Sequence, residues 1–201
     1  ERFIPAFLEL GGKDPAVILP SANLADAADA ILRGAVTATG QVCLALERVY
    51  VHESRHDEFV ELLAAKARQV RMNYPDIDQG DLGPLIFARQ ADIIDEHLDD
   101  ALAKGARIAC GGKTVDLGGG RYCPATVVTH VNHSMKLMTD ETFGPVIPVM
   151  GFRTVDEAVA LANDSEYGLS AAVFAGTLEE ARAVAERINA GGLSLNDAAL
   201  T

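Results

Sequence analysis

Two short segments hold residue types that can carry covalent or acid–base chemistry. Residues 9–13 (ELGGK) place the carboxylate of Glu9 beside two glycines, which let a backbone approach another group closely. Residues 40–43 (GQVC) place Cys43 just after a glycine turn, where a thiol is more exposed than in a core. A cysteine thiolate is a nucleophile, and a carboxylate whose pKa is raised toward neutrality is a general base.

Taken alone, neither segment decides a function. Residues 9–13 also fit a strand that runs into a turn after the apolar residues 4–8. Cys43 has no histidine or lysine beside it in the sequence that would lower its pKa from about 8.5. On bare chemistry, a structural cysteine is therefore favoured over a nucleophile at position 43.

The sequence gives little support for a phosphate-binding, dinucleotide-binding or metal-binding motif. Residues 112–114 (GKT) resemble the end of a phosphate-binding loop, but Arg107 stands where its first glycine is needed, so a β-hairpin turn fits better. The sequence contains no GxGxxG dinucleotide motif. His130 and His133 lie close together without a cysteine or carboxylate at ligand spacing, so we predict no metal site.

The elements that must position these segments alternate between helix and strand. Apolar residues at helical spacing predict helices within residues 23–37, 59–70 and 93–102. Runs of β-prone residues predict strands at residues 48–52, 106–110, 125–129, 146–152, 169–175 and 193–195. Thr154 and Thr177, each with a glutamate three residues on, form capping boxes that predict two further helix starts. We therefore predict an α/β fold, a three-layer domain with a mostly parallel sheet.

The composition narrows the class of protein. The chain has 201 residues, of which 49% are hydrophobic and 23% charged, as in an ordinary globular domain. Its formal net charge of −12 repels phosphate backbones, so we expect no nucleic-acid partner. Three cysteines without a C-x-x-C motif fit the reducing cytoplasm. No apolar run approaches the roughly 18 residues of a membrane span, so we expect a cytoplasmic protein with no membrane partner.

Three motifs together resemble the NAD(P)-dependent aldehyde dehydrogenase superfamily in both order and spacing. They are residues 9–13 (ELGGK), 40–43 (GQVC) and 141–145 (ETFGP). Smaller matches lie at Arg48, Pro84, residues 167–169 (YGL), Val173 and Phe174. The resemblance runs from about residue 1 to Asn196, which is nearly the whole chain.

The resemblance implies the chemical roles that the residues alone left open. Cys43 matches the nucleophile, which attacks the aldehyde carbon to give a thiohemiacetal and whose backbone amide forms half of an oxyanion hole. Hydride transfer to NAD or NADP then leaves a thioester. Glu9 matches the general base that activates water to hydrolyse it.

The resemblance also implies which residues contact the cofactor and the substrate. Glu141 matches the residue that holds the nicotinamide ribose, Phe143 packs near the nicotinamide ring, and the backbone of Leu10 lies by its carboxamide. Val42 and Leu44 flank the nucleophile in an apolar tunnel for a small-molecule aldehyde.

In this family roughly half of the chain precedes the ELGGK motif and holds most of the cofactor site. The resemblance therefore implies that residues 1–11 end the cofactor-binding domain and that residues 12–201 are a catalytic domain, truncated at both ends. The parent enzyme is expected to be a homodimer or homotetramer. The 201 residues alone are expected not to oxidise aldehydes, because most of the site for the oxidant is outside them.

Three other functions remain as alternatives. An acylating enzyme would release its thioester to coenzyme A instead of water, but retention of Glu9 argues against it. A reductase of acyl phosphates is disfavoured for the same reason. The non-enzymatic alternative is a catalytically silent domain that only assembles with other subunits.

Overall fold

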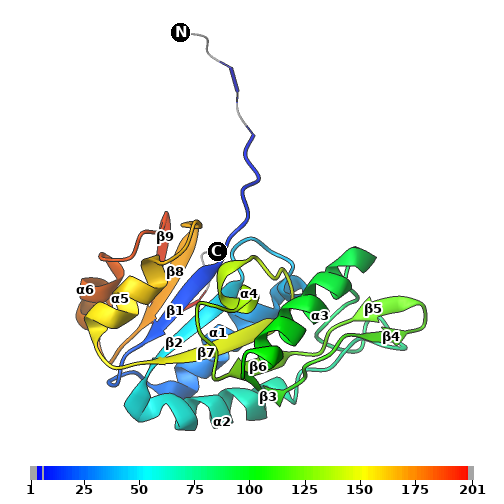
Figure 1. Cartoon of the computed structure of the whole chain (residues 1–201), viewed down its shortest axis with the longest axis horizontal. Helices are drawn as coiled ribbons and strands as arrows, with labels where there is room; N and C mark the ends of the chain where they lie inside the picture. Colours follow the sequence, from blue (N-terminus) through cyan, green and yellow to red (C-terminus); the bar gives the residue numbers. More distant parts are fainter. Residues whose placement is uncertain (1–3, 6, 199–201) are drawn as a thin grey trace.

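The computed structural model describes residues 4–5 and 7–198, and its centre is a seven-stranded sheet (Figure 1). The strand order is β3-β6-β7-β2-β1-β8-β9, and every neighbouring pair is parallel except β3 with β6. The strands are β1 (Asp14–Ile18), β2 (Leu46–His52), β3 (Arg107–Cys110), β6 (Thr126–Thr129), β7 (Val146–Phe152), β8 (Ser170–Phe174) and β9 (Gly192–Leu195). This arrangement confirms the predicted α/β fold with a mostly parallel sheet.

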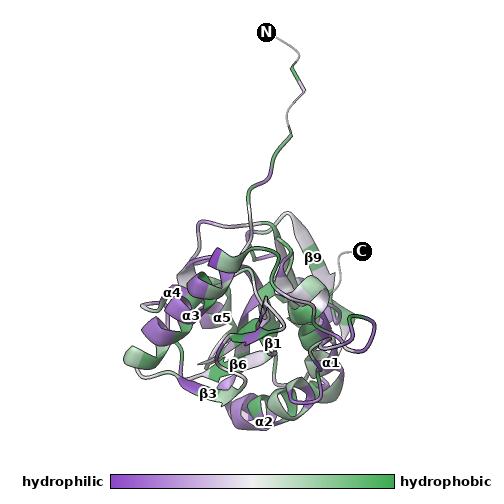
Figure 2. Cartoon of the chain, turned by 90° about the vertical axis from the view of Figure 1, so that its right-hand side faces the viewer, coloured by the Kyte–Doolittle hydropathy of each residue, from purple (hydrophilic) through white to green (hydrophobic). Residues whose placement is uncertain are grey.

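Helices cover both faces of the sheet. They are α1 (Leu24–Val36), η1 (Thr37–Gly40), η2 (Glu53–Arg55), α2 (His56–Ala67), α3 (Ala88–Ala103), α4 (Lys136–Thr139), α5 (Val155–Asn163) and α6 (Leu178–Ala185). Ile31 of α1 and Phe59 of α2 belong to the core on one face, and Ile94 of α3 belongs to the core on the other. Figure 2 shows α3, α4 and α5 on one side of the strands and α1 on the opposite side. Within the described ranges, no helix is long and apolar enough to cross a membrane.

The strand β1 is the strand of the main sheet that the sequence did not predict, and the short helices η1, η2 and α4 were not predicted either. All five of its residues are buried, and it pairs with β2 on one side and β8 on the other. The alternative interpretation of residues 9–13, a strand that runs into a turn, is wrong, because residues 7–10 form no strand. A buried strand needs neighbours on both edges, and the sheet provides them only after the ELGGK motif.

The two predicted capping boxes are present in part. The hydroxyls of Thr154 and Thr177 accept the amides of Glu157 and Glu180 at 3.2 and 3.1 Å, as the motif requires. The reciprocal half differs, because the Glu157 carboxylate accepts the amide of Arg153. The Glu180 carboxylate instead accepts the Ser21 hydroxyl, which ties α6 to the loop after β1.

A hairpin is present, but the prediction that residues 112–114 form its turn is wrong, because these residues only precede its first strand. The hairpin consists of β4 (Val115–Leu117) and β5 (Gly120–Tyr122), which pair antiparallel outside the main sheet. Residues 118 and 119 are glycines with φ of 57° and 87°, the left-handed conformation that such a tight turn favours. Residues 112–114 are thus followed by a strand and not by the helix that a phosphate-binding loop needs.

All three motif segments come directly before parallel strands. Residues 11–13 lead into β1, residue 43 comes shortly before β2, and residues 141–145 lead into β7. Because β1, β2 and β7 are successive neighbours in the sheet, their amino ends meet at one edge. Ligands of open α/β sheets usually bind outside the carboxyl ends of the strands. The candidate site of this chain therefore lies at the opposite edge.

Candidate active site

The backbone of the ELGGK segment lies directly against the backbone of Cys43. A Cβ atom on Gly12 would lie only 2.0 Å from the carbonyl oxygen of Cys43, so glycine is required for this approach. The Gly12 amide also donates a 2.9 Å hydrogen bond to Oε1 of Glu141. One glycine thus touches both other motifs, and the three motifs form a single site.

A buried ion pair underlies that contact. Lys13 Nζ lies 2.7 Å from Oε2 of Glu47, and the two side chains are 0% and 2% exposed. Glu47 also accepts the amides of Thr142 and Phe143, each at 2.7 Å, and Lys13 donates to the Thr142 hydroxyl at 3.0 Å. Burial lowers the pKa of Lys13, which the charge of Glu47 opposes. The pair therefore joins β1 and β2 to the loop before β7.

The neighbouring cation, Arg48, is stabilised by backbone oxygens. Its guanidinium is buried, and Nε donates to the carbonyl oxygen of Lys13 at 2.8 Å. The other two nitrogens donate to the carbonyls of Leu161 and Ala162, in the last turn of α5, at 3.3 and 3.1 Å. The C-terminal carbonyls of a helix carry partial negative charge. The end of α5 therefore helps to compensate the buried charge of Arg48.

The loop that carries Cys43 is held in a strained conformation. Ala38 and Thr39 have φ of 51° and 62°, which residues other than glycine rarely adopt. Gly40 packs so closely on the ETFGP segment that a Cβ atom there would lie 2.4 Å from the carbonyl carbon of Gly144. A left-handed backbone conformation at a residue other than glycine costs about 1–3 kcal/mol, and it persists only where the surrounding structure enforces it. The close packing of these two loops provides that enforcement.

Cys43 is the partly exposed cysteine of the chain. Cys110 and Cys123 are free and buried, whereas Cys43 is only half-buried. Burial raises the pKa of the Cys110 thiol and raises that of Cys123 to about 12. Val42 is half-buried and Leu44 is exposed, and their place in a substrate tunnel stays a prediction.

Glu141 presents a carboxylate with one oxygen held and the other open. Gly12 holds Oε1, while no hydrogen-bond donor among the described residues reaches Oε2. Gly11, with φ of 71°, leaves space here, because a Cβ atom on it would lie 2.8 Å from Oε2. Burial raises the pKa of Glu141, and the Gly12 hydrogen bond opposes this. An open carboxylate oxygen in a backbone cradle accepts hydroxyl groups, so these residues fit the ribose of a dinucleotide.

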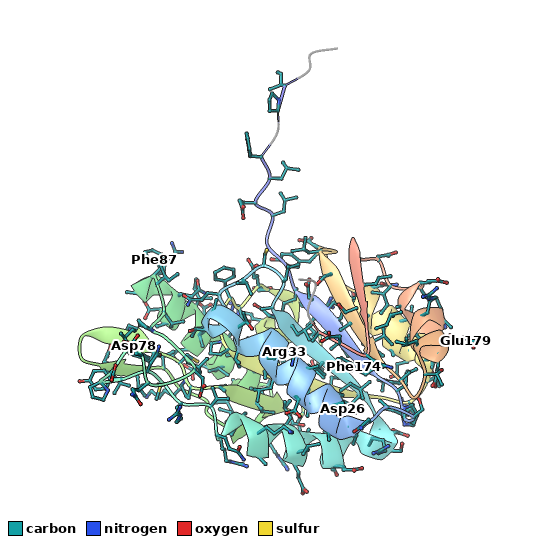
Figure 3. All side chains as sticks on the ribbon, turned by 180° about the vertical axis from the view of Figure 1, so that it is seen from behind. Asp26, Arg33, Asp78, Phe87, Phe174 and Glu179 are labelled. Carbon is teal, nitrogen blue, oxygen red and sulfur yellow. The ribbon has the colours of Figure 1, made fainter. Side chains whose placement is uncertain are left out.

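Glu9 and Leu10 lie outside this cluster. Residues 7–10 form an extended arm that leaves the domain (Figures 1 and 3), and Phe7 and Leu10 on it are 96% and 75% exposed. Glu9 is exposed, and no hydrogen bond joins it to Cys43 in the described part of the chain. The structure thus brings together Cys43 and Glu141 but does not bring Glu9 to them.

Near this cluster, two titratable side chains, His133 and Asp14, are held by hydrogen bonds to other side chains. His133 bonds the Tyr50 hydroxyl at 2.9 Å and the Asp164 carboxylate at 2.6 Å. The carboxylate of Asp14, at the start of β1, accepts the Ser170 amide at 3.1 Å and the Ser170 hydroxyl. Burial raises the pKa of Asp14 to about 6, although both hydrogen bonds oppose this.

Comparison with known proteins identifies the family. The sequence profile described as the aldehyde dehydrogenase family matches residues 1–201. The chain belongs to this family. The resemblance that the three motifs predicted is therefore confirmed.

Individual family members match over the same region. The solved structure of PutA from Anabaena variabilis, assigned as an aldehyde dehydrogenase, has 59% identity and a TM-score of 0.95, and the match covers 97% of this chain and 42% of that one. Lactaldehyde dehydrogenase of Escherichia coli (strain K12) is 39% identical over 94% of this chain and 40% of its own. NADP-dependent glyceraldehyde-3-phosphate dehydrogenase from Bacillus halodurans, solved with NADP, has 34% identity and a TM-score of 0.90 over 98% and 40%. The chain thus spans about two fifths of the length of such relatives.

Sequence patterns did not assign a role to Glu47 or Asp14. Glu47 and Arg48 stand within a run whose other residues, from Leu46 to Val51, are apolar or aromatic and buried. Charged residues inside a buried strand need partners, so this run contained a signal. It could not name the partners, because Lys13 and the loop before β7 are distant in sequence.

We predict that Gly12→Ala disrupts the junction between the motifs. Its methyl group would overlap the Cys43 carbonyl, so the backbone must move, at a cost of about 1–3 kcal/mol in the free energy of unfolding. Urea denaturation measures this cost. Gly151→Ala is the control, because the atom nearest to its added Cβ is 3.9 Å away. Equal stability of the two variants would contradict the packing described above.

We also predict that Asp14 makes folding pH-dependent. Its pKa is about 6 in the folded state against 3.8 ordinarily, so ionisation penalises the folded state and stability declines as pH rises from 4 to 6. Asp14→Asn removes this decline, and its free energy of unfolding relative to the wild type should rise by on the order of 2–3 kcal/mol across that range. Urea denaturation at several pH values measures it, with the exposed Asp156→Asn as control. A difference that does not change with pH would refute the prediction.

Proposed function

We propose that this chain is the catalytic domain of an enzyme that oxidises an aldehyde to a carboxylic acid with NAD or NADP. The observation that carries the proposal is the meeting of three segments at one sheet edge. There the Gly12 backbone lies against the backbone of Cys43, whose thiol is half-buried, and binds a carboxylate that has one open oxygen. Two relatives over the same region are named lactaldehyde dehydrogenase and NADP-dependent glyceraldehyde-3-phosphate dehydrogenase, and these names support an aldehyde-oxidising reaction.

In this proposal Cys43 is the nucleophile. Its sulfur attacks the aldehyde carbon, and its backbone amide donates to the developing oxyanion. A bound nicotinamide dinucleotide supplies the acceptor for the hydride that leaves this carbon. The acyl group then remains on the sulfur as a thioester. Glu9 removes a proton from the water that hydrolyses it, after the arm has folded back toward Cys43.

The remaining site residues orient the two reactants. Glu141 would accept the hydroxyls of the nicotinamide ribose, and Phe143 and the backbone of Leu10 would contact the nicotinamide. Val42 and Leu44 line the path of the aldehyde with apolar surface, which suits the carbon chain of a small substrate.

We further propose that residues 1–11 complete a cofactor-binding domain and that residues 12–201 form the catalytic domain. A phenylalanine that is 96% exposed, as Phe7 is, contributes nothing to the described fold, which supports a neighbouring domain as its cover. The parent enzyme, meaning a full-length protein that carries these residues, is a cytoplasmic homodimer or homotetramer in this proposal.

The first test compares the 201-residue chain with the parent enzyme. We expect the parent to reduce NAD or NADP with an aldehyde panel, and Cys43→Ser to abolish this activity. The chain alone should show less than about a thousandth of the parent rate, because positioning the oxidant is the protein's share of the chemistry. Absorbance at the reduced nicotinamide band measures both rates. Activity of the chain comparable to that of the parent would refute the domain proposal.

The same assay separates the alternatives. Turnover of the parent that requires coenzyme A would favour an acylating enzyme. Normal subunit assembly without turnover under either condition would favour a silent assembly domain.

The second test concerns the thiol itself. In the folded chain, iodoacetamide should label Cys43 at least about tenfold faster than Cys110 or Cys123, because those two are buried and their pKa values are raised. Peptide mass spectrometry gives the three rates. In the denatured chain the rates should converge, which provides the control. Equal rates in the folded chain would contradict a reactive Cys43.

A further inference from the structure

We propose that Glu47 is a positioning residue for the reaction, and that it acts on the cofactor side of the site and not on the thiol. This inference rests on the proposed function, because it concerns how Glu141 and Phe143 are held. Glu47 contacts neither the expected substrate path nor Cys43 through a hydrogen bond. Its effect must therefore pass through the segments that its carboxylate binds.

Both carboxylate oxygens of Glu47 accept hydrogen bonds. Oε2 accepts Lys13 Nζ and the Thr142 amide, both at 2.7 Å, while Oε1 accepts the Phe143 amide at 2.7 Å. The side chain is 2% exposed, so water cannot replace a lost partner. A glutamine at this position has one acceptor oxygen for three donors, and its amide hydrogens would face other donors. The charged carboxylate is therefore required by the geometry.

These hydrogen bonds set the conformation of the loop before β7. Phe143 has φ of 51°, a left-handed conformation that is costly for a phenylalanine and that needs outside support. The Glu47 carboxylate supplies it by accepting hydrogen bonds from the consecutive amides of Thr142 and Phe143. The Thr142 carbonyl is held as well, by Gln90 Nε2 at 2.7 Å.

This loop is continuous with the open carboxylate of Glu141. Glu141 immediately precedes Thr142, and its Oε1 is bonded to Gly12, the neighbour of Lys13. Glu47 thus holds both segments that meet at this hydrogen bond. It holds the segment of Glu141 through the Thr142 amide and the segment of Gly12 through the Lys13 ammonium. Loss of its charge should release Glu141 from its orientation toward the ribose.

The test is Glu47→Gln in the parent enzyme, with equilibrium binding of NAD and NADP measured by calorimetry. We expect the cofactor dissociation constant to rise at least about tenfold, because charged hydrogen bonds to two amides are lost. The iodoacetamide rate at Cys43 should stay within about twofold of the wild type, because the labelled sulfur is not bonded to Glu47. Asp95→Asn is the matched control, since Asp95 also accepts an amide and a hydroxyl, both from Thr114, in the region of the separate hairpin.

The outcomes separate this inference from the proposed function. Unchanged cofactor affinity in a folded Glu47→Gln variant would overturn it, as would a parallel loss of Cys43 labelling. If that variant does not fold, Glu47→Asp keeps the charge for Lys13 but is too short to hold both amides, and the same split is expected. A parent enzyme that binds cofactor without oxidising aldehydes would refute the proposed function. The role of Glu47 would then still be tested by the cofactor affinity of the Glu47→Gln variant. A parent that binds no cofactor would refute both.

Discussion

The buried pair of Lys13 and Glu47 is the interaction on which the site depends. Two charges removed from water carry a desolvation cost that their attraction seldom exceeds, so such a pair is a poor means of adding stability. Removal of one partner alone is costly, at about 3–5 kcal/mol, because the other charge stays buried. What the pair provides here is geometry. It joins β1 and β2 to the loop before β7, and so it brings three distant segments into contact.

The position of the site explains why cations are buried there. In a parallel α/β fold the helices return their C-terminal ends to the amino edge of the sheet, and those ends carry partial negative charge. Arg48 donates to the last carbonyls of α5 for this reason. At the same edge, the loop of Cys43 has a strained backbone and its thiol is partly exposed. The charge at the end of α5 and the parallel topology therefore place Arg48 and the Cys43 loop at the same end of the sheet.

Much of the fold was predictable, because hydrophobic period is local information. The five longer helices and most strands follow from it. The strand β1 does not, since it is only five residues long and contains Pro15, which weakens the signal for a strand. Cys43 and Glu141 were predicted from linear motifs. The role of Glu47 was not, because its partners depend on the register of β1, β2 and β7. The position of the arm with Glu9 could not be predicted from the sequence, since its apolar side chains do not pack against the described part of the chain.

The central claim is that Cys43 carries the acyl group during aldehyde oxidation. The most direct measurement is acid quenching of the parent enzyme during turnover, followed by mass spectrometry of its peptides. The variant Glu9→Gln is the best sample, because slow hydrolysis should let the thioester accumulate. We predict that the mass of the acyl group appears on the peptide that contains Cys43 and on neither of the peptides that contain Cys110 and Cys123. Reduced cofactor formed without an adduct on Cys43, or with the adduct elsewhere, would contradict the account.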